Sequence, residues 1–92
     1  MGSMPRVTFT ANLRRLIDCP TAEVSAATVG EALDAVFARA PGLRGYILDD
    51  QGGLRRHVVV FVGGEPVRDR ARLTDPVAAD AEIAVMQALS GG

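Results

Sequence analysis

Hydrophobic and polar positions alternate along Pro5–Ala11, where Val7 and Phe9 are separated by threonines. A period of two is typical of a strand with one buried face. The next segment, residues 12–20, is too short to predict a helix and ends in turn-forming residues, so we expect a loop there. A short second strand is predicted near Ala22–Ala26, and the two strands are expected to form a hairpin.

The apolar spacing then changes to that of an amphipathic helix. Thr28 is followed three residues later by Glu31, which is the arrangement of a capping box at the start of a helix. Spacings of three and four residues then define one apolar stripe, made of Val29, Ala32, Leu33, Val36, Phe37 and Ala40. The Pro41-Gly42 pair predicts that this helix ends at about Ala40.

The second half of the chain alternates turns and strands. Leu43–Leu48 predicts a short helical turn, and Asp49–Gly53 is dense in turn-forming residues. The strongest strand pattern is Arg55–Val62, which Gly63-Gly64 closes with a predicted tight turn. After a polar and irregular stretch, the final strand is predicted over Glu82–Ala88.

This order predicts an α+β domain in which one main helix packs on one face of a mixed four- to five-stranded sheet. The even-numbered valines from 58 to 62 are expected to meet the helix, which turns Val59 and Phe61 outward. The same alternation turns Met86 outward in the final strand. Val59, Phe61 and Met86 therefore form a candidate partner-docking patch. The alternatives are cover by a loop or a second copy, or a strand that is buried on both faces.

Composition narrows the class of protein. Ninety-two residues, 48% of them hydrophobic, suffice for one small domain with a single core. The net charge of −1, without a basic run, argues against nucleic acid as a partner. The single cysteine, Cys19, cannot form an internal disulfide, and neither a signal peptide nor a membrane-spanning run is present. We therefore expect a cytoplasmic protein that has no membrane partner.

The domain limits follow from the two ends of the sequence. We expect residues 1–3, which precede a second methionine, to be an expression scar. Residues 4–89 are expected to form the single domain. Residues 90–92, Ser-Gly-Gly, are expected to form a flexible tail.

The candidate chemistry lies in the last two residues, Gly91 and Gly92. Without Cβ atoms this pair can enter a narrow channel, and the terminal carboxylate is unhindered. Such a carboxylate suits attack on the α-phosphate of ATP, followed by attack of a sulfur or amine nucleophile on the acyl carbon. The alternative explanation is an accident of composition.

Three other groups of residues do not predict a metal, catalytic or phosphate-binding site. His57 lies beside two arginines without a second metal-ligand type, which predicts a surface histidine. Asp49–Gly52 carries only part of a calcium-loop pattern and lacks the closing glutamate. Gly63-Gly64 has no P-loop lysine. We therefore expect no metal site and no bound cofactor, and a carrier rather than an enzyme.

Taken together, the segment Arg55–Arg68, the turn at Asp80 and the Gly91-Gly92 end resemble the ubiquitin-like β-grasp sulfur carrier proteins of the MoaD/ThiS family. That family includes the small subunit of molybdopterin synthase, the thiamine-pathway carrier and a carrier that serves a cysteine synthase in actinobacteria. The resemblance runs from Arg6 onward. The Asp49–Gly53 insertion looks closer to the molybdopterin and cysteine-pathway members.

The resemblance implies a route for sulfur. An E1-like enzyme would adenylate the Gly92 carboxylate with ATP, a sulfurtransferase or cysteine desulfurase would supply sulfur, and an acceptor synthase would consume the thiocarboxylate. ATP is then used by the partner and not bound by this chain. Gly91 and Gly92 match the family's functional residues directly, whereas Phe61 and Met86 match partner-contacting positions approximately.

Three segments depart from the family pattern. Gly63 stands where many members have Asn, and Ala79-Asp80-Ala81 replaces a usual Asp-Gly-Asp turn. The segment before the glycines, which contains Leu89 and Ser90, lacks the usual proline. Acceptors discriminate at this tail, so Leu89 and Ser90 are candidate partner-binding residues. The pathway, whether molybdopterin, cysteine or a specialised metabolite, stays open.

Two other functions remain open. A ubiquitin-like modifier would be joined through Gly92 to lysines of target proteins. An interaction domain whose glycines are incidental would keep its partner binding after the tail is trimmed.

Overall fold

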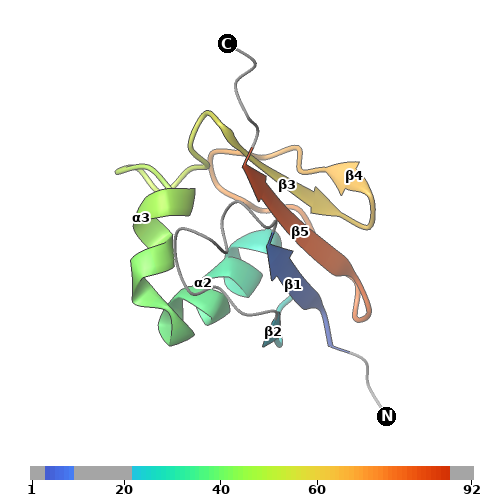
Figure 1. The fold of residues 1–92 in the computed structure, drawn as a ribbon. Helices are drawn as coiled ribbons and strands as arrows, with labels where there is room; N and C mark the ends of the chain where they lie inside the picture. Colours follow the sequence, from blue (N-terminus) through green and yellow to red (C-terminus); the bar gives the residue numbers. More distant parts are fainter. Residues whose placement is uncertain (1–3, 10–21, 88–92) are drawn as a thin grey trace.

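The computed structural model describes residues 4–9 and 22–87, which form one mixed sheet with a helical layer on one face (Figure 1). The strands are β1 (Arg6–Phe9), β2 (Ala22–Glu23), β3 (Val58–Val62), β4 (Glu65–Pro66) and β5 (Glu82–Gln87). Their spatial order is β2-β1-β5-β3-β4. β1 runs parallel to β5, and the other neighbouring pairs are antiparallel. The predicted α+β class with a mixed sheet is confirmed.

The two N-terminal strands pair antiparallel, as the predicted hairpin requires. Of the predicted segments 5–11 and 22–26, the first strand begins one residue later, at Arg6, and the second ends three residues earlier, at Glu23. The Val24 N–H donates to the Pro5 carbonyl at 2.9 Å, so pairing continues slightly beyond the strands. Residues 10–21, with the predicted loop, lie outside the described residues.

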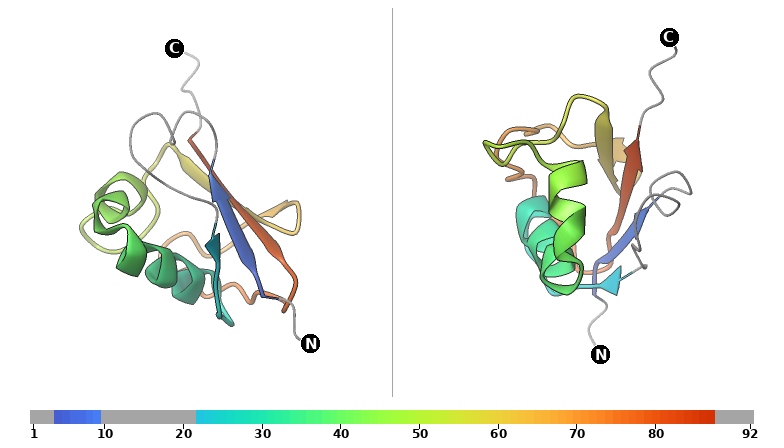
Figure 2. Two further views of the ribbon diagram at one scale, coloured as in Figure 1. Left: turned by 60° about the horizontal axis from the view of Figure 1, so that its bottom comes forward. Right: turned by 60° about the vertical axis from the view of Figure 1, so that its left-hand side comes forward.

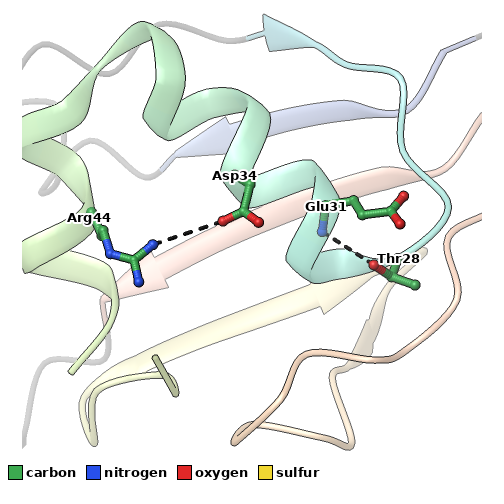
Figure 3. A network of polar contacts seen from close by, with 4 residues as sticks. All are labelled: Thr28, Glu31, Asp34 and Arg44. Carbon is green, nitrogen blue, oxygen red and sulfur yellow. Dashed lines mark hydrogen bonds and ion pairs between the residues drawn. The ribbon is translucent and has the colours of Figure 1, made fainter. Parts of the chain in front are cut away.

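The helix α2 (Val29–Arg39) begins at the predicted capping box (Figure 3). Thr28 Oγ1 accepts a hydrogen bond from the Glu31 N–H at 3.2 Å, and the Glu31 carboxylate accepts one from the Ala27 N–H at 2.9 Å. The glutamate thus reaches one residue further back than in the usual motif, where the N-cap N–H is the donor. The helix ends before Pro41, as predicted.

α2 lies over one face of the sheet (Figure 2). Its apolar stripe is buried in the core that helix and sheet share. The stripe residues Val29, Ala32, Leu33, Val36 and Phe37 are buried, and Ala40 packs against the same core. The sheet contributes Val7, Phe9, Val58, Val60, Ile83 and Val85. Removal of these side chains from water is the main force that holds helix and sheet together.

A short helical turn follows α2, as predicted for residues 43–48. It consists of the 3-10 helix η1 (Pro41–Leu43) and the one-turn helix α3 (Arg44–Ile47). The Arg44 guanidinium lies 4.0 Å from the Asp34 carboxylate of α2 (Figure 3). Both side chains are exposed, so this ion pair contributes little to stability.

The turn predicted at residues 49–53 is present and is closed by one side chain. Asp49 Oδ1 accepts hydrogen bonds from the Gln51 N–H at 2.9 Å and the Gly53 N–H at 3.1 Å. Hydrogen bonds from the backbone to the Asp49 side chain therefore stabilise the turn that the sequence predicts.

The predicted strand Arg55–Val62 is wrong in its first three residues, because β3 begins only at Val58. The Val58 N–H donates to the Arg55 carbonyl at 3.0 Å, and the Arg55 N–H donates to Ile47 at 3.0 Å. Residues 55–57 therefore form a turn in which the backbone groups bond away from the ladder. His57 is exposed, as predicted.

Two carboxylates fix the irregular segment 68–77. Asp75 accepts hydrogen bonds from the Arg68 N–H at 3.0 Å and the Asp69 N–H at 2.8 Å, and Asp69 accepts one from the Thr74 hydroxyl. These bonds stabilise the ionised carboxylates. The Thr74 hydroxyl is the largest cause that lowers the pKa of Asp69, and the Arg68 N–H is the largest that lowers the pKa of Asp75.

The same segment caps the start of α2 with backbone carbonyls. The Val29 N–H donates to the Asp75 carbonyl at 3.0 Å, and the Gly30 N–H donates to the Leu73 carbonyl at 2.9 Å. Both donors belong to the first helical turn, where N–H groups have no partner within the helix. Leu73 adopts a left-handed φ of 59°, a conformation that is strained for leucine.

Candidate functional site

The outer face of the sheet, which α2 leaves uncovered, carries the predicted docking residues. Val59 lies opposite Met86, and Phe61 lies opposite Ala84, in the antiparallel pair of β3 and β5. Directly opposed residues share a face of the sheet, so these four side chains meet there. Their sequence neighbours Val58, Val60, Ile83 and Val85 are fully buried on the inner face. We call Val59, Phe61, Ala84 and Met86 the apolar patch.

Exposure within the apolar patch agrees with the predicted orientation. Val59 and Phe61 are only partly buried, and Met86 exposes 38% of its surface. The alternative in which β3 is buried on both faces is therefore wrong for these residues.

An open depression of about 470 Å³, which we call the hollow, lies next to the apolar patch. The hollow is lined by Phe61, Gly63, Gly64, Glu82, Ala84 and Met86. Ala84 carries only a methyl group, and a Cβ at either glycine would meet no atom within 4 Å, so these three residues fill little of the hollow. The turn glycines and one small strand residue thus leave room between two large apolar side chains.

A row of charged side chains crosses the outer face at Glu82, which also lines the hollow. Arg6 of β1 lies opposite Glu82 of β5 and opposite Glu23 of β2. All three side chains are exposed. The outer face therefore changes along β5 from a charged row at Glu82 to apolar residues near its C-terminal end.

The C-terminal end of β5 is where the tail sequence begins. Gln87, its last residue, lies opposite Val58 at the start of β3. The candidate residues Leu89, Ser90, Gly91 and Gly92 lie outside the described residues. Five residues separate Gln87 from the end of the sequence, and five residues span at most about 18 Å. Any protein that acts on the Gly92 carboxylate must therefore reach close to this end of the sheet.

The full sequence matches the ThiS family model over residues 7–92, which is nearly its whole length. The chain belongs to the ThiS family. Members of this MoaD/ThiS group are small ubiquitin-like carriers or modifiers rather than catalysts.

Individual relatives agree with this membership. Over 66 residues, the ThiS-family chain is 39% identical to small archaeal modifier protein 1 of Haloferax volcanii, which covers 72% of this chain and 71% of the relative. The crystal structure of that protein superposes with a TM-score of 0.81 at 31% identity, over 98% of this chain and 100% of the other.

A second solved structure comes from a complex. One chain of the Amycolatopsis orientalis BexX/CysO complex matches with a TM-score of 0.81 at 27% identity, over 96% of this chain and 99% of the other. The ubiquitin-like β-grasp fold predicted from the sequence is confirmed.

The described part of this ThiS-family chain lacks two other features. Residues 4–9 and 22–87 contain no group of three His, Cys, Asp or Glu residues placed to hold a metal ion. Within the same residues, no helix has the length and apolar character needed to cross a bilayer.

The sequence pattern does not reveal the role of two residues on the outer face. It places Glu82 and Ala84 only in the final strand, whereas the structure shows that they line the hollow. The available signal was a small residue at an outward position, two residues before Met86.

Arg70, which the sequence leaves in an irregular stretch, donates from its guanidinium to the Arg55 carbonyl at 2.8 Å and so supports the fold.

Proposed function

We propose that this ThiS-family protein is a sulfur carrier whose Gly92 carboxylate is the reactive group. The observation that carries the proposal is that the sequence ends on Gly91-Gly92 five residues after β5, a strand whose outer face carries part of the exposed apolar patch. The family supports the general kind of function.

The chemistry has two steps. A Gly92 carboxylate oxygen attacks the α-phosphorus of ATP, pyrophosphate leaves, and an acyl-adenylate results. A sulfide sulfur then attacks the acyl carbon, AMP leaves with the original oxygen, and a proton is released to solvent. The product is a thiocarboxylate, which an acceptor synthase consumes.

The scaffold supplies position rather than catalysis. β5 ends beside the start of β3, so the sequence of the tail follows from that end of the sheet, while the apolar patch gives a partner a surface to bind. We propose that the E1-like adenylating enzyme, a sulfurtransferase or cysteine desulfurase as sulfur donor, and the acceptor synthase supply the reacting groups in the cytoplasm. The BexX/CysO complex, in which one chain is similar to this one, supports binding of a partner protein in general.

A second candidate function shares the first step. The relative at 39% identity is named as a modifier, which favours conjugation of Gly92 to lysines of other proteins. A lysine amine would then replace sulfide as the nucleophile on the acyl carbon, with AMP as the leaving group. The two functions differ only in the acceptor.

The deciding experiment measures the intact mass after incubation with the adenylating enzyme of the same organism, ATP and sodium sulfide. Replacement of one oxygen by sulfur in the full chain, absent from a variant that lacks Gly91 and Gly92, supports the carrier. Lysine conjugates in cell extract without that mass change support the modifier. A truncated variant that still gains sulfur would overturn both functions.

A further inference from the structure

We propose that, when no partner is bound, the Gly92 carboxylate binds to Arg70 and Arg72 in a pocket on the side of the sheet that the helices cover. We call this site the arginine pocket. The inference rests on the proposed function, in which Gly92 ends the chain with an unmodified carboxylate. It adds a resting site from which the adenylating enzyme must draw the carboxylate before the reaction can begin.

The arginine pocket has a volume of about 410 Å³ and lies between residues 49–54 and residues 70–72. Both segments lie on the helical side of the sheet, away from the hollow (Figure 2). The two walls are joined by the Leu54 N–H, which donates to the Arg70 carbonyl at 2.8 Å. The fold itself therefore forms this pocket, and no partner is needed to shape it.

The charge of the arginine pocket favours an anion. Arg70 and Arg72 line it together with one carboxylate, that of Asp49. Asp49 Oδ1 already accepts hydrogen bonds from the Gln51 and Gly53 N–H groups. Among the described residues, the Arg72 guanidinium has neither a hydrogen-bond acceptor nor an ion-pair partner. A guanidinium can bind a carboxylate through two parallel N–H groups, so this side chain suits such a ligand.

Arg70 is held in place before any ligand binds. Its Nη2 donates to the Arg55 carbonyl at 2.8 Å, and the residue is only partly exposed. That bond uses one of the five N–H groups of the guanidinium and leaves others for a carboxylate. A cation that is already positioned loses little side-chain freedom when it binds an anion.

The tail is long enough to bring its carboxylate to Arg70. The Arg55 carbonyl accepts hydrogen bonds both from Arg70 Nη2, at 2.8 Å, and from the Val58 N–H, at 3.0 Å. Val58 in turn lies opposite Gln87, the last residue of β5. Because paired Cα atoms lie about 5.5 Å apart or less, Arg70 Nη2 is no more than about 13 Å from the Gln87 Cα. The five residues after Gln87 span up to about 18 Å, so the tail of the same molecule suffices.

The covalent link makes a weak contact sufficient. Ion pairs at a protein surface are individually weak. A short tether, however, keeps the ligand at an effective concentration in roughly the millimolar range. We therefore expect the carboxylate to occupy the arginine pocket for much of the time and to leave it readily.

Substitutions of the two arginines test the contact. Arg72→Gln removes one cation and leaves the bond to the Arg55 carbonyl intact, and Arg70→Gln removes the other cation. Arg39→Gln removes the same charge from the exposed surface of α2 and serves as the control. The NMR signals of the Gly92 amide and of the Arg72 side-chain Nε–H group report the contact in the full-length protein without a partner.

We expect both pocket variants and about 0.5 M sodium chloride to shift the Gly92 amide signal in the same direction, whereas the control variant leaves it in place. Deletion of Gly91 and Gly92 should move the Arg72 Nε–H signal. In ATP–pyrophosphate exchange with the purified adenylating enzyme, Arg72→Gln should lower the KM for the carrier by roughly twofold to fivefold. The kcat should not change, because the variant only raises the fraction of carboxylate that is available.

Three results would overturn the inference. The first is a Gly92 signal that is the same in Arg72→Gln and in the wild type; because Arg72 is exposed, this variant decides the question even if Arg70→Gln does not fold. The second is a contact that strengthens with protein concentration, which would mean that the carboxylate binds a second copy. The third is a raised KM for Arg72→Gln, which would mean that the enzyme and not the tail uses this arginine.

The two readouts separate the inference from the proposed function. If the Gly92 signal responds as expected but the wild type supports no pyrophosphate exchange, the proposed function is wrong and the resting site stands. If exchange proceeds and the Gly92 signal does not respond, only the inference is wrong.

Discussion

Val59 lies directly opposite Met86 across the antiparallel pair of β3 and β5, on the face of the sheet that α2 does not cover. The pair brings two apolar side chains from separate strands together one residue before β5 ends. Because Met86 is 38% exposed, it is accessible to a partner and contributes little to the core.

Met86→Arg should therefore weaken binding to the adenylating enzyme by roughly tenfold or more, since it places a charge inside an apolar contact. Stability should change by no more than about 0.5 kcal/mol, as is usual for surface substitutions. Isothermal calorimetry and thermal unfolding measure the two effects. Met4→Arg makes the same change at another exposed methionine and should bind normally. Equal binding by both variants would show that the apolar patch is not an interface.

The helix cap gives a prediction about stability alone. Thr28→Ala removes the hydroxyl that accepts from the Glu31 N–H, and loss of an N-cap side chain costs about 1 kcal/mol. For a domain of this size, that loss lowers the Tm by roughly 4–8 °C.

A second substitution gives a reference value for the stability loss of Thr28→Ala. Arg44→Ala breaks the exposed pair with Asp34 and should change stability by less than about 1 kcal/mol. Differential scanning calorimetry compares the two variants. A Thr28→Ala protein as stable as Arg44→Ala would mean that the backbone carbonyls of residues 68–77 cap α2 by themselves.

The parts of the fold that sequence reasoning predicted are those in which pattern and burial agree. The stripe on α2 and the alternation in β3 and β5 repeat at helical and strand periods, so they identify the core faces directly. Phe61 and Met86 could be placed outward for the same reason.

The features that the sequence did not show depend on contacts between residues that are distant in the chain. The start of β3 moved to Val58 because the Arg55 backbone bonds to Ile47 and Val58, a choice that no local pattern encodes. The hollow requires Gly63, Gly64 and Ala84 to lie side by side, which only the β3–β5 register determines. These three small residues are not adjacent in the sequence, so the hollow that they leave can be recognised only in the folded structure.

The carboxylates of Asp69 and Asp75 predict how stability depends on pH. Hydrogen bonds lower both pKa values in the folded protein, so each carboxylate stabilises the fold when it is ionised. That contribution is complete above the pKa of an unfolded aspartate and is lost as the pH falls below about 4 through the folded values.

Asp75→Asn removes the ionised acceptor of the Arg68 and Asp69 N–H groups, so it should lower the Tm at pH 7. Its Tm should also fall less than that of the wild type when the pH is lowered below 4, because no carboxylate is left at this position to be protonated. Asp80→Asn removes the same charge in an exposed turn and should keep the wild-type pH profile. Thermal unfolding followed by circular dichroism at several pH values provides the comparison. Parallel profiles for wild type and Asp75→Asn would contradict the assigned role.

The turn between β3 and β4 gives the last prediction, because its two glycines are not equivalent in what they tolerate. Gly63 has a φ of 58° and Gly64 a φ of 87°, so both central residues adopt the positive values of a type I′ hairpin turn. Asn enters the left-handed region more readily than other side chains, which explains why a family pattern with Asn at the first position fits the same turn.

Gly64→Ala should therefore cost about 1–2 kcal/mol of stability, whereas Gly63→Asn should cost much less. Gly42→Ala is the matched control, since an added Cβ there meets no atom within 4 Å and Gly42 has no positive φ. Urea unfolding gives the three free energies. A Gly64→Ala protein as stable as Gly42→Ala would mean that the turn can change its type, and the hollow beside it would then change shape as well.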